Sequence, residues 1–375
     1  MKIIRTDIYR FSIPMTAPVN VGGRVLHDRE GLLLALTDGE GRCAYGEIAP
    51  LPGFDSVTLE RCLRDIPSVR RTLNDAPLDC ERFQIADPLL GVIDVPVSSW
   101  SAHTLFGVES ALMGLFLQCG MKRRPASGGL LMEEPLRIPV NALFIPEAAA
   151  DRLDMQILKL KDSGSATVKI KIGRLPAEEE IRQIRRLAGG MGPGIVLRLD
   201  GNRNLTPAVY RHYFEALREL PVEYVEEPLP EEEVGRVGDV PWPLALDESL
   251  GRVLDQEEPC LSGLAPAVQV IILKPGRLRG LHAFARLVRE AEKTGIRTIL
   301  SSAFNTGVTL AVLGVFSRLA GLRPETAHGL DTLRYLSADI LLPSPEIFRG
   351  KLEVPGRLLF GRASMNENCI REKVR

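Results

Sequence analysis

The chain has 375 residues, of which 45% are hydrophobic and 25% are charged, as in an ordinary globular protein with a substantial core. Its 47 lysines and arginines almost balance its 48 aspartates and glutamates, so the charge argues against a nucleic-acid or membrane partner. Aromatic residues account for only 5% of the chain, which also disfavours a surface that stacks on bases.

Two further features concern location and redox state. The N-terminus lacks the apolar segment of a signal peptide, and polar residues interrupt the uncharged stretch Thr298–Ser317. We therefore expect a buried strand, loop and helix in that stretch and a cytoplasmic protein. The cysteines form neither a C-x-x-C pair nor a zinc spacing, so we expect them to be reduced; they are Cys43, Cys62, Cys80, Cys119, Cys260 and Cys369. Nothing in the pattern specifies an oligomeric state.

The N-terminal third of the chain mixes short strands with helical stretches. Alternation predicts strands over Ile3–Ile13 and Gly31–Leu36. Apolar residues at helical spacing follow over Gly107–Leu117, with a C-cap at Gly120. The next segment, Lys122–Gly129, is polar and rich in helix breakers, and we place a domain boundary there.

Beyond residue 135, short β-prone runs alternate with helical segments. Eight such runs predict parallel βαβ units that close into a (β/α)₈-type barrel. A doubly wound open sheet is the structural alternative, but no G-x-G-x-x-G follows any of these strands. We therefore predict an α/β protein whose barrel strands are Ile138–Phe144, Thr167–Ile172, Ile195–Asp200, Val222–Glu226, Leu244–Asp247, Val268–Leu273, Thr298–Leu300 and Glu325–His328, with helices over Ala177–Leu187, Pro207–Leu217 and Leu281–Glu292.

The second of these strands carries two lysines on one face. Because strand side chains alternate, Lys169 and Lys171 share one face and the flanking Val168, Ile170 and Ile172 share the other. Helices cover the outside of a barrel, so the apolar residues belong outside and the lysines inside. Two lysines in a K-x-K pattern would ordinarily be interpreted as solvated side chains on an edge strand. The strands that follow favour an active site instead.

Three successive strands end in acids, namely Asp200, Glu226 and Asp247. The carboxyl ends of barrel strands face the active site, and neighbouring strands lie about 5 Å apart. We therefore expect the three carboxylates to converge. An oxygen-only ligand set suits a hard cation such as Mg²⁺, with Mn²⁺ as a substitute. The alternative is a set of salt bridges at the barrel mouth.

The next strand ends in Lys274, which places the acids between lysines from opposite sides. This arrangement suits removal of a proton next to a carboxylate, because a divalent ion stabilises the enediolate that forms. A lysine near a metal and a second cation has a lowered pKa and can act as the base. The substrate expected on this ground is a small-molecule carboxylate.

These features together resemble the enolase superfamily, muconate-lactonizing-enzyme subgroup, whose use of a Lys base with Mg²⁺ is established. The resemblance implies an α+β capping domain (residues 1–125, completed by about 337–375) on a modified barrel (135–336). It implies Asp200, Glu226 and Asp247 as Mg²⁺ ligands, and Lys171 and Lys274 as flanking catalytic groups. Supporting positions implied in the same way are Lys169, Arg198, Asn202, Glu227 and Glu248.

The segment Gly46–Phe54 resembles the capping loop of the o-succinylbenzoate synthase family, whose reaction is a dehydration in menaquinone synthesis. By this resemblance Lys171 removes the α-proton and returns it to the departing hydroxyl, while Lys274 stabilises the enediolate. Without the resemblance the segment is only a turn-rich loop. The stretch Val19–Arg24 is either a lid or a plain hairpin loop. Candidate substrate contacts are Arg24, Pro52, Phe54, Ser301 and Ser302.

Two alternatives remain open. An N-acylamino acid racemase or dipeptide epimerase of the same superfamily also needs two lysine bases, so the catalytic set does not separate it from a dehydratase. A non-catalytic barrel retained for binding is the other alternative, and the intact set of acids and lysines argues against it.

Overall fold

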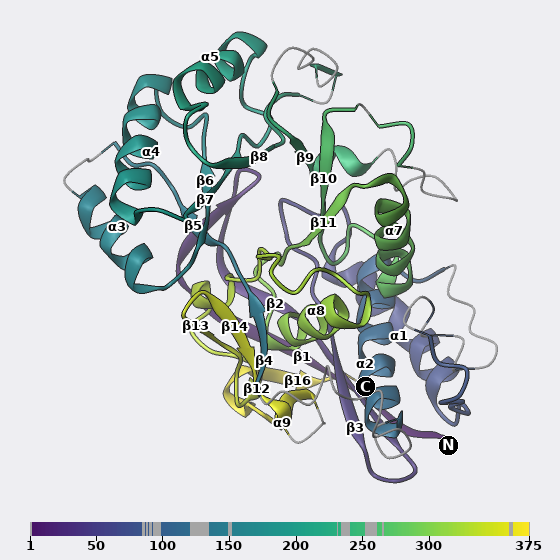
Figure 1. The fold of residues 1–375 in the computed structure, drawn as a ribbon. Helices are drawn as coiled ribbons and strands as arrows, with labels where there is room; N and C mark the ends of the chain where they lie inside the picture. Colours follow the sequence, from purple (N-terminus) through teal and green to yellow (C-terminus); the bar gives the residue numbers. More distant parts are fainter. Residues whose placement is uncertain are drawn as a thin grey trace.

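The computed structural model describes residues 2–84, 87, 89, 92, 99–120, 135–148, 152–230, 232–233, 241–251, 261–264, 266–359 and 363–374. The predicted linker Lys122–Gly129 lies outside these residues. An N-terminal antiparallel sheet with two helices packs beside a parallel sheet flanked by helices (Figure 1).

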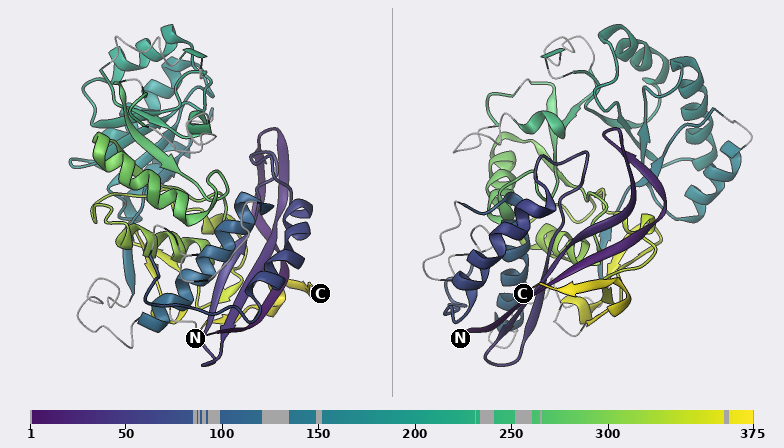
Figure 2. Two further views of the ribbon diagram at one scale, coloured as in Figure 1. Left: turned by 90° about the vertical axis from the view of Figure 1, so that its right-hand side faces the viewer. Right: turned by 180° about the vertical axis from the view of Figure 1, so that it is seen from behind.

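The N-terminal sheet has the strand order β16-β1-β2-β3. Its strands are β1 (Ile3–Val21), β2 (Arg24–Asp38), β3 (Cys43–Ile48) and β16 (Ile370–Lys373). β1 and β2 form one long hairpin, so the two predicted strands are confirmed but extend to the Gly22-Gly23 turn. β16 pairs antiparallel with β1, which brings the C-terminal tail back to the N-terminal sheet (Figure 2).

Two helices, α1 (Leu59–Leu73) and α2 (Ala102–Gly120), cover this sheet. Their apolar faces share one core cluster with buried residues of β1 to β3, including Ile8, Leu34 and Leu112. The predicted helix over Gly107–Leu117 is confirmed and begins five residues earlier. Buried apolar area of this kind is what stabilises a sheet covered on one side.

One prediction about the cysteines is wrong. Cys80 and Cys119 form a disulfide, with their Cα atoms 6.7 Å apart. They are 39 residues apart in sequence, and only the packing of the end of α2 against the segment around Cys80 brings them together. Cys43, Cys62 and Cys369 are free, and Cys260 lies outside the described residues.

The barrel is a seven-stranded parallel sheet of order β11-β10-β9-β8-β7-β6-β5. Six predicted strands reappear in it within one or two residues of their expected ends. The strands are β5 (Ala142–Phe144), β6 (Thr167–Lys171), β7 (Val196–Asp200), β8 (Val222–Glu226), β9 (Leu244–Leu246), β10 (Val268–Leu273) and β11 (Arg297–Leu300). The helices around it are α3 (Leu153–Asp162), α4 (Ala177–Met191), α5 (Pro207–Leu217), α7 (Gly280–Thr294) and α8 (Gly307–Leu319).

The predicted eighth strand, Glu325–His328, is reduced to a short bridging segment. His328 bridges Val140 and Gly329 bridges Ser301, both in the parallel sense. The Gly329 N–H donates to the Leu300 carbonyl at 2.8 Å. This segment completes the ring between the first and seventh strands, so the fold is a modified (β/α)₈ barrel with an N-terminal α+β capping domain.

The predicted first strand, Ile138–Phe144, divides in two. β4 (Leu136–Pro139) pairs antiparallel with β14 (Lys351–Val354), and only β5 joins the barrel. Pro139 has no N–H to donate, which favours a break in the ladder at this point. The remaining short elements are β12 (Leu341–Leu342), β13 (Glu346–Phe348), β15 (Ser364–Met365), α9 (Gly356–Leu359), and 3₁₀ turns at Glu248–Leu250, Leu333–Tyr335 and Glu367–Cys369. No helix among the described residues is long and apolar enough to cross a membrane.

Candidate active site

The carboxyl ends of the barrel strands open into a cavity of about 620 Å³. The tip of the β1–β2 hairpin and the loop after β3 contribute residues to its wall. Figure 2 shows this hairpin extending from the capping domain alongside the barrel. Its lining residues are Val19, Asn20, Val21, Gly22, Leu51, Gly53, Phe54, Asn141, Leu143, Ile145, Lys169, Lys171, Arg174, Asn202, Asn204, Glu248, Lys274, Ser301, Ser302, Ala303, Phe304, Gly329, Asp331, Thr332 and Tyr335.

Strand register sets the charged residues side by side. Lys171 is the register partner of Asp200, and Asp200 is the partner of Glu226. On the opposite face of β6, Val168 and Ile170 are fully buried in the core against the helices. The alternation predicted from the sequence therefore holds, because the apolar face packs outward and the lysines are left facing the barrel mouth.

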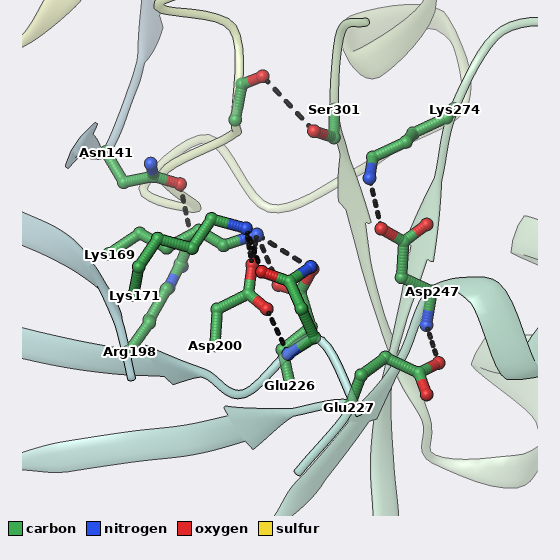
Figure 3. A network of polar contacts seen from close by, with 12 residues as sticks. Asn141, Lys169, Lys171, Arg198, Asp200, Glu226, Glu227, Asp247, Lys274 and Ser301 are labelled. Atoms are coloured by element: carbon green, nitrogen blue, oxygen red, sulfur yellow. Dashed lines mark hydrogen bonds and ion pairs between the residues drawn. The ribbon is translucent and has the colours of Figure 1, made fainter. Parts of the chain in front are cut away.

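The lysines neutralise the carboxylates directly (Figure 3). Lys169 Nζ lies 2.7 Å from Asp200 Oδ2 and 2.7 Å from Glu226 Oε1. Lys171 Nζ donates to Asp200 Oδ2 and to Asn202 Oδ1, each at 2.7 Å. Lys274 Nζ donates to Asp247. Each expected metal-ligating acid is thus paired with at least one lysine.

These pairs shift the pKa values of the buried groups. Burial and, after it, the negative charge of Asp200 outweigh the opposite effect of Lys169 and together raise the pKa of Glu226 to about 7. Burial would also raise the pKa of Asp200, but Lys169 and Lys171 hold it well below its ordinary value. Two lysines contact Asp200, whereas Glu226 shares one of them, Lys169, with Asp200.

The lysines respond in the opposite direction. Burial would lower the pKa of Lys169, but Asp200 and Glu226 raise it well above its ordinary value. Burial would likewise lower the pKa of Lys274, but Asp247 raises it. In both lysines the neighbouring carboxylates therefore outweigh burial and stabilise the protonated form.

The oxygen donors of the three acids suit a hard cation, but their side chains are not grouped closely enough to bind one. Within the described part of the chain, no three His, Cys, Asp or Glu side chains lie close enough together to hold a metal ion. Asp200 and Glu226 are register partners that both contact Lys169, whereas Asp247 contacts Lys274. All three are at most 5% exposed, and they offer only oxygen donors.

Two buried oxygens support this fit. Among the residues that the structure describes, Glu226 Oε2 lies 2.7 Å from Lys169 Nζ but accepts no well-aligned hydrogen bond, and Glu248 Oε2 finds no hydrogen-bond partner. Buried carboxylate oxygens without a donor are costly. A divalent cation would satisfy them, so the residues present fit the metal that the sequence predicts.

Glu227 supports the acid at the end of β9. Its Oε1 accepts from the backbone N–H groups of Asp247 and Ser249, both at 2.8 Å. Its Oε2 accepts from Ser249 Oγ at 2.7 Å and from Arg203 Nε at 3.1 Å. Glu227 and Asn202 have φ values of 39° and 44°, a left-handed conformation that is strained for residues other than glycine and concentrates at functional sites.

Arg198 lies below the site, where it ties the barrel together. Its Nε donates to Glu223 at 2.7 Å, and its Nη1 donates to Asn141 Oδ1 at 3.2 Å and to the Ala327 carbonyl at 2.7 Å. Sequence reasoning missed Asn141, Arg203 and Glu223, since their roles depend on residues far away in sequence.

The candidate substrate contacts divide into two groups. Ser301, Ser302 and Phe54 line the cavity, whereas Arg24 and Pro52 are not part of the wall that the structure describes. Phe54 places its ring 5.0 Å from Lys274 Nζ and 4.3 Å from the Arg277 guanidinium carbon, so the capping loop touches the lysine at the end of β10. Arg174 also lines the cavity and was not predicted.

Comparison with known sequences shows similarity in both halves of the chain. A family described as "Enolase C-terminal domain-like" matches residues 152–358, and one described as "MenC, N-terminal domain" matches residues 3–82. An o-succinylbenzoate synthase from Pasteurella multocida is 28% identical over 354 residues, covering 92% of this chain and 94% of that protein. Protein PHYLLO, chloroplastic, from Arabidopsis thaliana is 25% identical over 359 residues, and the chain spans 20% of its length.

Comparison with solved structures shows a shared fold. A muconate lactonizing enzyme from Mucobacterium Smegmatis, complexed with muconolactone, has a TM-score of 0.74 at 20% identity and covers 99% of this chain and 100% of its own. A dipeptide epimerase from Enterococcus faecalis, complexed with Mg and the dipeptide L-Leu-L-Tyr, has a TM-score of 0.73 at 19% identity and covers 94% and 97%.

Proposed function

Because the chain belongs to the enolase C-terminal domain-like family, we propose that it is a Mg²⁺-dependent lyase, an o-succinylbenzoate synthase. The reaction is the syn-dehydration of 2-succinyl-6-hydroxy-2,4-cyclohexadiene-1-carboxylate to o-succinylbenzoate, a step of menaquinone synthesis. The observation that carries the chemistry is the placement of Lys171 and Lys274 on β6 and just beyond β10, on either side of the buried acids. The match of residues 3–82 to the MenC N-terminal family supports the substrate.

The proposed reaction uses one lysine twice. Neutral Lys171 Nζ takes the proton from the carbon that bears the carboxylate, and the electron pair moves into the enediolate. The pair then returns to the ring as the bond to the neighbouring hydroxyl breaks, and Lys171 gives its proton to that hydroxyl, which leaves as water. Lys274 stays protonated and stabilises the enediolate charge. Lys169 supports Lys171.

Asp200, Glu226 and Asp247 would hold Mg²⁺, or Mn²⁺ in its place, and the bound ion would supply stabilisation of the enediolate charge. We further propose that residues 1–125, completed by 337–375, form the capping domain and that residues 135–336 form the catalytic barrel.

A racemase or epimerase is the second candidate, favoured by the same two lysines. Proton removal by one and return by the other on the opposite face would invert a stereocentre, and dipeptide epimerases share the fold. A non-catalytic binding barrel is the third alternative. The cavity carries both lysines, which argues against that reading.

One experiment separates the three. The purified chain is given the cyclohexadiene substrate with Mg²⁺ in a spectrophotometric assay, beside a racemisation panel of N-acylamino acids and dipeptides. We expect dehydration that stops when a chelator removes the metal and returns when Mg²⁺ is restored. Racemisation without dehydration would establish the second candidate, and neither activity together with no Mg²⁺ binding would establish the third.

A further inference from the structure

Arg29, on β2, joins the capping domain to the barrel through backbone carbonyl groups. Its side chain is 1% exposed. Its Nε donates to the Phe304 carbonyl at 3.0 Å, in the barrel loop after β11. Its Nη1 donates to the carbonyls of Pro50 at 2.8 Å and Glu30 at 3.0 Å, and its Nη2 donates to that of Ala49. One buried guanidinium therefore holds two cavity loops of different domains, using the fixed fork of donors that arginine provides.

Glu47, on β3, holds the same barrel loop from a second point. Its Oε2 accepts from Thr306 Oγ1 at 2.8 Å and from the Thr306 N–H at 3.1 Å. Its Oε1 accepts from Asn305 Nδ2 at 3.3 Å. Thr306 is the N-cap residue of α8, where a carboxylate is favoured by the unpaired N–H groups and the helix dipole.

The residue held between these contacts has an unusual backbone. Phe304 has a φ of 53°, a left-handed conformation that costs a residue other than glycine on the order of 1–3 kcal/mol and persists only where its surroundings impose it. Its ring packs edge-on against Tyr335, with ring centroids 5.4 Å apart. Both side chains line the cavity. Phe304 also packs with Val21, Leu51 and Ala303 in one small apolar cluster between the domains.

We propose that Arg29 and Glu47 are positioning residues that impose this conformation on Phe304, and that Phe304 is a specificity-determining wall of the substrate cavity. Its ring packs on the methylene groups of the substrate's acyl chain. The capping domain then selects the substrate in two ways, through its own loops and by fixing the conformation of Phe304 in the barrel. The identity of that acyl chain, succinyl, rests on the proposed function.

The test compares Arg29→Met and Glu47→Gln with Glu109→Gln as a matched control. Glu109 is also a buried capping-domain carboxylate that accepts from the barrel, through His282 N and Nδ1, but it does not line the cavity. Arg29→Met and Glu47→Gln, the two clamp variants, should each raise KM about tenfold and leave kcat within about twofold. This result is expected when a contact that binds the substrate and the transition state equally is lost. Glu47→Gln retains the shape of the side chain and provides the test if Arg29→Met fails to fold.

Hydrogen exchange of residues 301–306 gives a readout that needs no substrate. Exchange at Thr306 N–H should accelerate in both clamp variants and stay unchanged in Glu109→Gln. Glu47→Gln weakens the acceptor of this N–H, and Arg29→Met removes the donor to the Phe304 carbonyl in the same loop. An equal rise of KM in the control, or unchanged exchange in the clamp variants, would overturn the inference. Failure of the wild-type chain to dehydrate the cyclohexadiene would refute the proposed function instead, and hydrogen exchange would still decide whether the clamp exists.

Discussion

Replacing Glu227 by glutamine should weaken Mg²⁺ binding although Glu227 itself is not proposed to touch the metal. Its two carboxylate oxygens accept four hydrogen bonds, from Asp247 N, Ser249 N, Ser249 Oγ and Arg203 Nε. Glutamine keeps one oxygen and places an NH₂ group against two of those donors. The two lost bonds at a fully buried position cost about 2–6 kcal/mol of unfolding free energy, at about 1–3 kcal/mol for each unsatisfied group.

The metal affinity should fall because Glu227 fixes the backbone N–H of Asp247, the proposed ligand. Loss of a residue that orients a metal ligand by hydrogen bonding commonly lowers the affinity for the metal by about 10- to 100-fold. Calorimetric titration of Mg²⁺ measures this directly, and chemical denaturation measures the stability change.

Glu223→Gln provides the matched control. Glu223 lies at the other end of the same strand, where it pairs with Arg198 and Arg297. Its loss should lower stability and leave Mg²⁺ affinity within about twofold. Unchanged affinity in Glu227→Gln, or an equal loss in Glu223→Gln, would refute the claim that Glu227 orients the metal ligand.

Three further outcomes are expected, two at the site and one at the buried Asp339. Lys171→Ala should abolish dehydration while Mg²⁺ binding and the circular dichroism spectrum stay intact; substantial residual turnover would contradict its role as the base. Asp247→Asn should weaken Mg²⁺ binding in calorimetry by at least about tenfold, and an unchanged affinity would remove it from the ligand set. Burial raises the pKa of Asp339 from 3.8 to about 6, so its contribution to stability is full below pH 3.8 and is lost as the pH rises through 6. Denaturation curves of wild type and Asp339→Asn between pH 4 and 7 should converge as the pH falls, and a pH-independent gap would contradict this.

The parts of the site that depend on strand periodicity could be predicted from the sequence. Alternation alone places Lys169 and Lys171 on one face, and the order of strands sets Asp200 beside Glu226. The same reasoning does not reach Arg203, Glu223 or Asn141. Their partners are 24, 25 and 57 residues away in sequence, and a polar residue carries no local mark of which distant group it will meet.

Two other failures also arise from tertiary contacts. The disulfide between Cys80 and Cys119 joins segments with no shared motif, so the spacing of cysteines does not reveal it. The eighth strand is reduced to two bridges, one between His328 and Val140 and one between Gly329 and Ser301. A β-prone run predicts that a segment is extended, but its neighbours decide how much of it pairs.

The pairing of lysines with acids at the barrel mouth explains how one set of residues can serve both folding and catalysis. Asp200, Glu226 and Asp247 are buried, and buried charges are tolerated only when paired; Lys169, Lys171 and Lys274 supply that pairing. On the proposed function the same three acids would also hold a divalent cation, which would supply further positive charge for the enediolate. Acids and lysines lie together on neighbouring strand ends, since Lys171 is the register partner of Asp200 and Asp200 that of Glu226. Each of these charged groups lies beside one of opposite sign, so the residues proposed for catalysis also stabilise one another in the folded barrel.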